Sequence, residues 1–336
     1  MKYTVLTILS LIVILCRPPA AAVDTMKVLM LASPYDNLPS EEAVSIDSLN
    51  GKVFINGRFY SGRLRIMKDS NGLYVINHLP FERYVEGVVA SELGKDWELE
   101  ALKAQAVISR TYAIFYRNLN AGKDFHLTSS VLHQLYKGAN TDPLIAYAVK
   151  ATEGEILTYN GLPIKAFFHA TCVGKTEIPE EVWSESLPYL KSVDCNTKNA
   201  PYSAWQRRFS LAEIARRLGI SGLKDIKISS YTATGRVRTL RLIRKGPGPS
   251  REIRATELRK LLGFSELPST RFSLSVRGGN MIFTGSGYGH GVGLSQWGAF
   301  AMAREGKDYR EILMHYYPGT TLTNNRRMYS RAAPTD

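Results

Sequence analysis

The chain has 336 residues, of which 44% are hydrophobic and 22% are charged, and its formal net charge is +13 at pH 7. This composition excludes an intrinsically disordered chain, and the length suffices for one large domain or two modest ones. The positive charge does not sit in one tail, and it favours an anionic partner such as nucleic acid, an acidic lipid surface or an anionic wall polymer.

The first 22 residues have the three-part form of a secretory signal peptide. Lys2 is basic, an apolar run extends from Val5 to Cys16, and small residues end the segment at Ala20–Ala22. The apolar run is short for a membrane span, and two prolines follow it. We therefore expect residues 1–22 to direct export to the periplasm or cell wall, with an uncleaved membrane anchor as the alternative.

Residues 26–78 alternate short apolar runs with turns and contain Asn-Gly pairs at 56–57 and 71–72, a pattern that predicts a small antiparallel sheet. Helical periodicity then runs from Phe81 to about Leu119, with one break at 94–96. A third helix is expected from near Pro143 to Gly154. Two further strands are expected, in 155–161 and 163–171.

The pattern changes at about residue 205. A helix with Ser210 as its N-cap and Gly219 at its end is followed by a basic hairpin over 225–246 and a second short helix over 254–263. We therefore expect residues 205–270 to form a small basic subdomain inserted in the main fold. Its Lys and Arg alternate with apolar positions, which is typical of a solvated strand face; a grip on an anionic polymer is the alternative.

The last third contains a glycine-rich stretch near 285–293 and two helices, one from about Ser295 to before Gly306 and one over 308–319. The expected fold is α+β, with an N-terminal antiparallel sheet, a helical region and the inserted subdomain. The main fold would comprise 23–204 and 271–325, and residues 326–336 would be a tail.

One carboxylate stands out in the first predicted helix. The apolar side chains form a stripe along it: Phe81, Tyr84, Val85, Val88, Val89 and Leu93. Glu92 continues this stripe, so we expect it to face the core or the floor of a cleft. Burial raises the pKa of a carboxyl group and favours the protonated state that a general acid needs. The structural alternative is a carboxylate at a helix end that pairs with a nearby cation.

Two cations on the next helix bear on that carboxylate. Lys103 and Arg110 are seven residues apart, which is close to two turns, so they share one helix face. If this helix folds back across Gly94, both cations would point toward Glu92. Opposite charge lowers the pKa of an acid whereas burial raises it, and the sequence leaves the balance open.

The remaining candidate residues are one histidine and two cysteines. The stretch around His290 lacks the spacing of a nucleotide-binding loop, so no nucleotide cofactor is expected. Its glycines predict a tight backbone crossing that exposes His290 and directs the next helix's N-terminus toward a cleft. Cys172 and Cys195 are compatible with a disulfide or with two unpaired buried thiols. No clustered Cys/His pattern occurs, so no zinc site is expected.

Several long segments now resemble, in the right order, the successive motifs of the SpoIID family. They are LPFERYVEGVVASEL, LEALKAQAVISRTYA, HQLYKG, FFHATCVGKTE, VWSESLPYLKSV and GYGHGVGLSQWGA. The resemblance extends from about residue 78 to 322, and the family includes stage II sporulation protein D and the amidase enhancer domain. It implies a lytic transglycosylase that cleaves the bond from N-acetylmuramic acid to N-acetylglucosamine and closes a 1,6-anhydro ring without water.

The resemblance also implies roles for particular residues. The Glu of the family's ASE motif falls on Glu92, which would be the single general acid and base. The motif Lys and Arg fall on Lys103 and Arg110, which would hold Glu92 or bind the glycan. Lys175 and His290 lie in other motif blocks and would bind substrate. Some members hold zinc in the loop after the second helix, but residues 124–136 here keep two histidines and no cysteine, so no bound metal is expected.

The expected partner is therefore peptidoglycan, and the resemblance suggests glycan strands that lack stem peptides. A rival hypothesis is a non-enzymatic module that binds wall glycan and stimulates a partner cell-wall amidase. Nucleic-acid binding, which charge alone would allow, conflicts with the export signal, so no nucleic-acid partner is expected.

Overall fold

The computed structural model describes residues 25–33, 46–49, 52–55, 58–69, 72–130, 133–197, 200–246 and 250–324. The expected signal segment 1–22 and the tail 326–336 lie outside the described residues. Within the described ranges, no helix combines the length and apolarity that crossing a bilayer requires. Helices and small sheets both occur, so the α+β fold expected from the sequence is confirmed.

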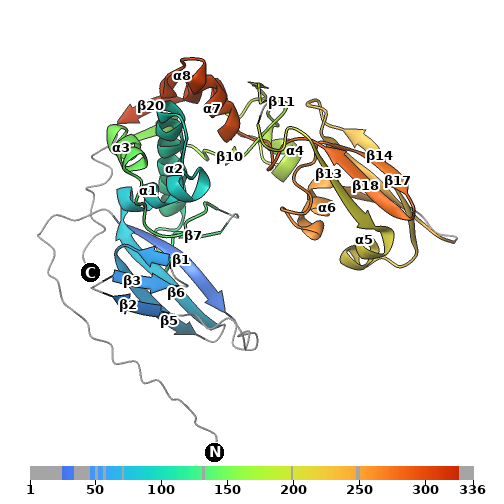
Figure 1. The fold of residues 1–336 in the computed structure, drawn as a ribbon, viewed down its shortest axis with the longest axis horizontal. Coiled ribbons are helices and arrows are strands. Elements are labelled where there is room, and N and C mark those ends of the chain that lie inside the picture. The colour runs from blue at the N-terminus through green and yellow to red at the C-terminus, as the bar shows by residue number, and fades with distance from the viewer. Residues whose placement is uncertain are drawn as a thin grey trace, which may run out of the picture.

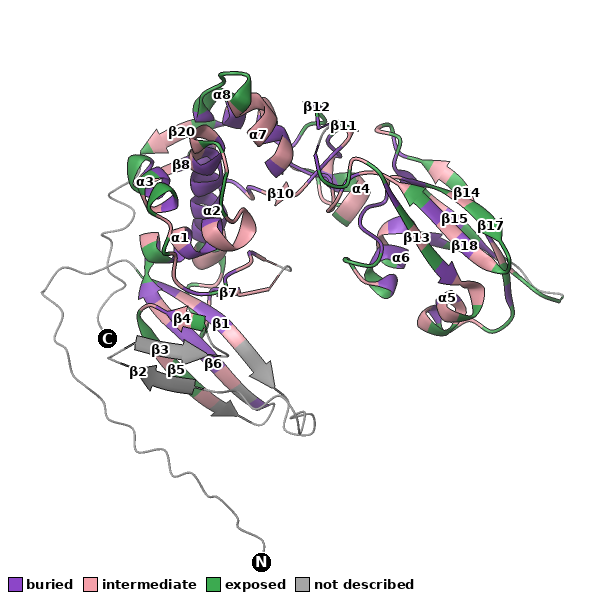
Figure 2. Cartoon of the chain, viewed as in Figure 1, coloured by how far each residue is buried: buried purple, intermediate pink, exposed green. Residues whose placement is uncertain are grey.

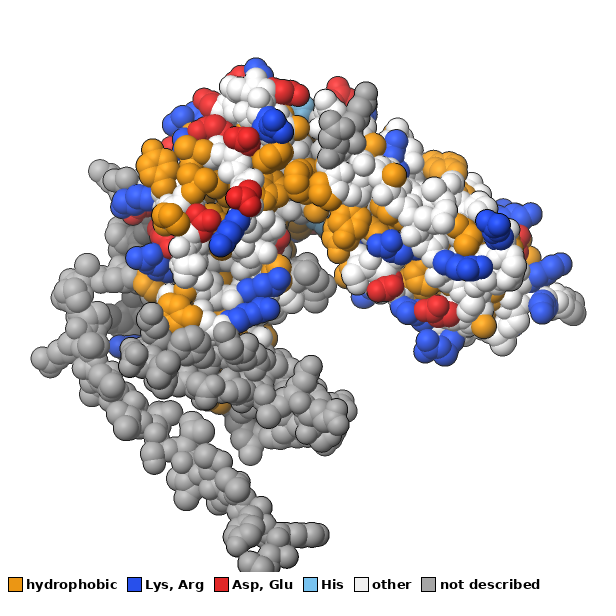
Figure 3. Space-filling view, viewed as in Figure 1, with side chains coloured by type: hydrophobic (Ala, Val, Ile, Leu, Met, Phe, Trp, Pro, Cys, Tyr) orange, Lys and Arg blue, Asp and Glu red, His pale blue; other side chains and the backbone are white. Residues whose placement is uncertain are grey.

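The chain forms two lobes, each with its own hydrophobic core (Figure 1). The first core draws its residues from between 26 and 190 and from between 292 and 317. The second draws its residues from between 205 and 283. The chain therefore passes from the first lobe into the second and returns to the first. Hydrophobic side chains lie on the surface where the two lobes meet (Figure 3).

The N-terminal part consists of two small sheets. Strands β1 (Thr25–Ser33), β5 (Arg63–Asp69), β6 (Gly72–Pro80) and β7 (Leu127–Thr128) form one, in the order β5-β6-β1-β7. Strands β2 (Ile46–Leu49), β3 (Lys52–Ile55) and β4 (Arg58–Tyr60) form the other. The expected antiparallel pairing is confirmed, and only β7 joins in parallel. The turn residues 56–57 and 70–71 lie outside the described residues.

The helical region begins where β6 ends. Its helices are α1 (Phe81–Glu92), α2 (Leu99–Leu119) and α3 (Pro143–Ala151). The break predicted after α1 is present, with Gly94 in the left-handed region at φ +76°. Every residue of α2 from Ala104 to Ile114 is buried, which Figure 2 shows as a purple helix in the middle of the lobe. A helix buried on all sides is the centre of a core, and α2 contacts α1, α3, α7 and α8.

The C-terminal segment completes the first lobe. It contains α7 (Gln296–Arg304), α8 (Tyr309–Tyr316) and β20 (Thr321–Asn324). Strand β20 pairs with β8 (Glu155–Tyr159), whose other neighbour is β9 (Leu162–Pro163). The strand expected over 163–171 is wrong for most of its length, because only Pro163, in β9, and Phe168–His169, in β10, lie in strands. Between them the backbone N–H of Lys165 donates to the Tyr189 hydroxyl instead of a strand partner.

The second lobe is built from two three-stranded sheets and two helices. The sheets are β13-β18-β17 and β14-β15-β16. In chain order the elements are β13 (Trp205–Ser210), α5 (Leu211–Leu218), β14 (Leu223–Tyr231), β15 (Val237–Arg244), β16 (Arg251–Arg254), α6 (Ala255–Leu262), β17 (Phe272–Arg277) and β18 (Asn280–Gly285). The predicted caps of α5 are confirmed: the Ser210 side chain accepts a hydrogen bond from Glu213, and Gly219 has φ +63°.

This lobe extends past the boundary expected at residue 270. Strand β18 pairs with β13 along its whole length, and β17 pairs with β18. Phe272, Met281 and Phe283 belong to the second core. We therefore propose that the inserted unit comprises residues 205–285. A unit that ended at residue 270 would not include β18, which is the partner of β13.

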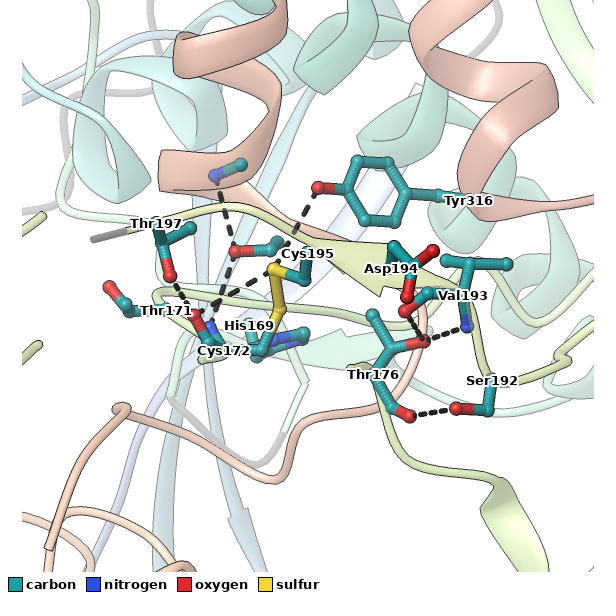
Figure 4. The surroundings of a disulfide bond; sticks show 12 residues. His169, Thr171, Cys172, Thr176, Ser192, Val193, Asp194, Cys195, Thr197 and Tyr316 are labelled. Carbon is teal, nitrogen blue, oxygen red and sulfur yellow. Dashed lines mark hydrogen bonds between the residues drawn. A yellow bond between two sulfur atoms is a disulfide. The ribbon is translucent and has the colours of Figure 1, made fainter. Parts of the chain in front are cut away.

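A disulfide fixes the segment that leads into the second lobe. Cys172 and Cys195 are bonded and buried, which answers the question that the sequence left open (Figure 4). Strands β11 (Gly174–Lys175) and β12 (Asp194–Cys195) pair beside the bond, and the short helix α4 (Pro179–Trp183) lies between them in the chain. The side chain of Thr197 hydrogen-bonds to the Cys172 carbonyl.

Removing this bond is expected to lower stability. The two cysteines are 23 residues apart, and a closed loop of that size reduces the entropy of the unfolded chain by an amount worth about 3 kcal/mol. The double substitution Cys172→Ala and Cys195→Ala should therefore lower the free energy of unfolding by about that much in a urea titration. Chemically reduced wild-type protein serves as the control and should match the variant; an unchanged urea midpoint would contradict the assignment.

Candidate active site

A cleft of about 790 Å³ lies between the two lobes. Its lining comes from α1, α2, the segment 167–170, α4, the glycine-rich stretch and α7 on one side, and from α6 and the loop after it on the other. Representative lining residues are Glu92, Phe167, Trp183, Arg259, His290 and Gln296. Figure 3 shows the surface hollowed below the junction of the lobes, with hydrophobic side chains around the hollow.

Glu92 is the last residue of α1 and lies half-buried in this cleft, as its helical phase predicted. Its Oε1 accepts a hydrogen bond of 2.7 Å from the backbone N–H of Leu135. Burial raises the pKa of Glu92 to about 7, against the lowering effects of the Leu135 N–H, the Gln296 side chain and the charge of Lys137. Near neutral pH the carboxyl group is thus present in both protonation states, which is the condition for exchanging a proton with a substrate.

Gln296 is held in place by the buried helix. Its Nε2 donates to Gln105 Oε1 on α2 at 3.3 Å, and Gln105 in turn donates to Ser109. Gln296 is the first residue of α7, whose N-cap Ser295 accepts from the Gly298 N–H. The start of α7 was predicted, but the contact between Gln296 and Glu92 was missed, because 204 residues separate them in the chain.

Lys103 and Arg110 do not point toward Glu92, so that expectation is wrong. Lys103 Nζ lies 2.6 Å from Glu100 Oε1. The fully buried guanidinium of Arg110 donates to both carboxylate oxygens of Glu82, at 2.9 and 2.8 Å. Glu82 and Glu92 are ten residues apart on α1, or about 15 Å along the helix axis. Arg110 therefore fastens the start of α1, far from the carboxyl group at its end.

The cleft also carries aromatic rings and His290. The indole of Trp183 stacks on Phe167 with ring centroids 4.4 Å apart and planes at 25°. The His290 ring lies 4.9 Å from that of Trp183. Trp183 is 42% exposed, so part of its indole remains accessible to a ligand. Sequence reasoning missed Trp183 as a site residue, although it lies in one of the motif segments.

His290 lines the cleft and is half-buried, in agreement with the exposure that its flanking glycines predicted. Burial, together with the charges of Arg259 and Arg236, lowers the pKa of His290 to about 3. The backbone N–H of Val292 donates to its Nδ1 at 3.1 Å. The imidazole is therefore neutral with the hydrogen on Nε2, and the backbone of Phe168 accepts a hydrogen bond from the ring.

The glycine-rich stretch makes the close crossing that the sequence predicted. Gly291 has φ +89°, and a Cβ there would lie 2.5 Å from the Arg236 guanidinium. Gly293 has φ +71°, and a Cβ there would clash with the Phe167 carbonyl oxygen. These glycines let the backbone pass between the lobes and present His290.

Lys175 is not brought to the cleft. It lies on β11, its side chain is 61% exposed, and its Nζ is 3.9 Å from Asp194 on the paired strand β12. It is absent from the residues that line the cleft. Its position therefore does not support the expectation that Lys175 binds substrate.

The described residues contain no group of three or more His, Cys, Asp or Glu side chains arranged to hold a metal ion. The two histidines of segment 124–136 have separate partners. His126 Nδ1 accepts from the backbone N–H of Lys27 at 3.2 Å, and His133 Nδ1 lies 2.9 Å from the Thr128 hydroxyl.

Comparison with known proteins gives two family matches along the chain. The model for the stage II sporulation protein (SpoIID) matches residues 69–159, which include Glu92, Lys103 and Arg110. The model for a domain of unknown function (DUF8618) matches residues 180–293, which include Trp183 and His290. The residues that line the cleft thus come from both matched regions and from segments outside them.

Individual relatives match most of the chain. Stage II sporulation protein D of Bacillus subtilis is 34% identical over 276 residues, which cover 74% of this chain and 76% of that protein. An uncharacterized protein of Brachyspira hyodysenteriae is 34% identical over 301 residues, covering 88% and 80%. The amidase enhancer of Bacillus subtilis is 29% identical over 289 residues, covering 71% of this chain but 40% of that protein.

Arg110→Ala is expected to destabilise the folded protein. The substitution leaves Glu82 unpaired and removes the donors to the carbonyls of Val149 and Glu155, so the free energy of unfolding should fall by about 3–5 kcal/mol. Lys103→Ala breaks a partly exposed pair and should cost about 1 kcal/mol or less. Urea unfolding of both variants checks this; Arg110→Ala with unchanged unfolding but altered glycan binding would contradict it.

Glu92→Gln is expected to stabilise the protein at high pH. Because the pKa of Glu92 is raised from 4.5 to about 7 in the folded protein, the folded state binds the proton more tightly. Wild-type stability therefore declines as pH rises from about 4.5 through 7, by up to about 3 kcal/mol, and the neutral amide has no such decline. The unfolding free energies of the wild type and of Glu92→Gln should coincide at pH 4 and differ at pH 8. The same difference between the two proteins at both pH values would refute the raised pKa of Glu92.

Proposed function

The chain belongs to the SpoIID family, and we propose that it is a lytic transglycosylase that cleaves peptidoglycan glycan strands with Glu92 as general acid and base. Membership of this family links the chain to the cell wall. The observation that carries the proposal is the carboxyl group of Glu92, which lies in the cleft with a pKa of about 7.

The proposed reaction needs only one carboxyl group. Protonated Glu92 donates its proton to the glycosidic oxygen, and the bond from that oxygen to C1 of the muramic acid residue breaks. The Glu92 carboxylate then takes the proton from the 6-hydroxyl of the same sugar as this oxygen bonds to C1. The products are a free 4-hydroxyl on the leaving sugar and a 1,6-anhydro ring, and Glu92 ends protonated again. Hydrolysis of a glycoside would normally use a second carboxylate.

The second acidic residue of the cleft is a poor candidate for a second catalytic carboxylate. Glu257 is exposed on α6, and its carboxylate lies 3.8 Å from the Arg251 guanidinium in the second lobe. It therefore provides a matched control for Glu92: the same side chain in the same cleft, without the burial.

The aromatic lining of the cleft supports binding of a sugar. Trp183, stacked on Phe167 and next to the His290 ring, offers an apolar surface against which the C–H face of a pyranose packs. The volume of about 790 Å³ falls in the range of pockets that enclose ligands of a few hundred daltons. The cleft therefore suits a short stretch of a glycan strand.

The proposal gives Lys103 and Arg110 supporting roles rather than substrate contacts. Arg110 fixes α1 to α2 through Glu82, and Lys103 lies 2.6 Å from Glu100, whose other oxygen accepts from the Tyr309 N–H of α8. Both cations thereby hold the helix packing that places Glu92.

A second candidate function follows from the relative named amidase enhancer. In that case the cleft would bind wall glycan without cleaving it, and the chain would stimulate a partner amidase. The two functions predict different products from the same incubation.

Digestion of purified glycan strands separates them. The wild-type chain should produce 1,6-anhydro-muramyl ends, detected by mass spectrometry, from strands with or without stem peptides; the family resemblance favours the latter. Glu92→Gln should lower the rate by about 100-fold or more, the usual contribution of a general acid, whereas Glu257→Gln should retain most activity. Strands that bind the wild-type protein but stay intact would refute the transglycosylase and favour the amidase-enhancer function. Stimulation of an added amidase by Glu92→Gln would also favour the enhancer function.

The pH dependence gives an independent check on the role of Glu92. The first step needs the protonated carboxyl group, so kcat/KM should fall tenfold per pH unit above about pH 7. A rate that stays constant to pH 9 would contradict a Glu92 acid.

A further inference from the structure

The positive charge of the protein is concentrated in the second lobe. Residues 205–285 contain 17 of the 43 Lys and Arg but only 5 of the 30 Asp and Glu, so this lobe has a net charge of +12 and the rest of the chain +1. Figure 3 shows blue side chains spread over the described surface of that lobe. The excess positive charge therefore belongs to the second lobe and is separate from the carboxyl group of Glu92 in the cleft.

Five exposed basic side chains gather at one end of the β14–β15 hairpin. They are Lys224, Lys227, Arg241, Arg244 and Lys245, and we call this set the basic end. The strand register places Leu223 opposite Arg244, and the Lys245 N–H donates to the Gly222 carbonyl, so residues 222–227 and 241–245 lie side by side.

The acidic residues of the lobe compensate the basic end only in part. In the part of the lobe that the structure describes, the ion pairs join Arg217 to Glu213, Arg238 to Glu181 and Arg251 to Glu257, and none involves the basic end. Asp225 and Glu252 are the acidic residues in the adjoining strand positions. Together with the five cations they leave a net charge of +3 at this end.

One pair within the basic end is electrostatically unfavourable. Lys227 and Arg241 are directly opposite each other in the antiparallel register. Like charges in that arrangement destabilise a sheet. Glu252 on β16 is directly opposite Arg241 and offsets part of this repulsion, so an anion bound beside Lys227 would remove the remainder.

We propose that the basic end binds a linear phosphodiester polymer of the cell wall. Such a polymer carries one full negative charge on each repeat, so successive phosphates can engage the cations around the end of the hairpin. Arg side chains bind phosphate oxygens in pairs, and Lys side chains act as point charges toward them. The choice of a wall polymer rests on the cell-wall link of the family and does not depend on cleavage in the cleft.

The hairpin is poorly suited to a lipid surface. Binding to a bilayer combines charge with buried apolar side chains. Tyr231 is the exposed large apolar side chain on the two strands, and it follows Lys227 by four residues, about 13 Å along the strand. The basic end thus presents charge without an apolar anchor.

The test measures binding of fluorescent poly(glycerol phosphate) to the full chain. The variant Lys224→Gln, Lys227→Gln, Arg241→Gln removes three charges from the basic end, and the control Lys95→Gln, Lys123→Gln, Lys191→Gln removes three exposed charges from the first lobe. At about 0.1 M salt the first variant should bind at least tenfold more weakly, and its slope of log K against log salt should shrink by roughly two. The control should bind within about twofold of wild type.

Each other outcome overturns the proposal. Equal weakening in both triple variants would show unspecific attraction by net charge. Tighter binding to vesicles containing anionic phospholipid, or to duplex DNA at the same salt, would assign the basic end to a different partner. Thermal unfolding confirms folding, and the single variant Lys227→Gln, which relieves the like-charge pair, should be at least as stable as wild type.

Cleavage assays keep this inference separate from the proposed enzyme activity. The basic-end variant should digest bare glycan strands at the wild-type rate, because none of its substituted residues lines the cleft. A wild-type protein that binds the polymer but cleaves nothing would refute the transglycosylase and leave the polymer site intact.

Discussion

The burial of one carboxyl group, that of Glu92, is the constraint on which the candidate site depends. A carboxylate in water is ionised at neutral pH and has no proton to donate. At the end of α1 the loss of water outweighs the Leu135 N–H, the Gln296 side chain and the charge of Lys137, and the pKa of Glu92 rises to about 7. A cation placed directly against Glu92 would reverse that balance and keep the group ionised.

The structure keeps one cation of the neighbouring helix away from Glu92 by giving it another partner. Arg110 is buried against Glu82 at the start of α1, so the ion pair that orders α1 on α2 lies at the opposite end of α1 from Glu92. The second lobe is fixed in a comparable way: buried Glu177 of the first lobe accepts hydrogen bonds from Thr232 and Thr234 of the second. These contacts set the position of α6 as the other wall of the cleft.

Local sequence patterns predicted most helices and strands. They failed where a prediction depended on which helices and strands contact each other in the fold. Helical phase placed Glu92 in the cleft because an apolar stripe identifies the buried face of a helix. The same reasoning put Lys103 and Arg110 on one face of α2 but gave no information about which neighbour covers that face. Gln296 and Trp183 were missed because their contacts join segments far apart in the chain. The pairing of β13 with β18, seventy residues later, likewise left no signal at the boundary expected at 270.

The central claim is that Glu92 keeps its proton near neutral pH, and a direct titration of that carboxyl group tests it best. Carbon-13 NMR of protein labelled at the glutamate side-chain carboxyl carbon follows each group with pH, and the Glu92→Gln variant identifies the signal by its disappearance. We expect a midpoint at about pH 7 for Glu92. A midpoint near the ordinary 4.5 would show that the site holds a carboxylate, and the account of Glu92 as an acid would be wrong.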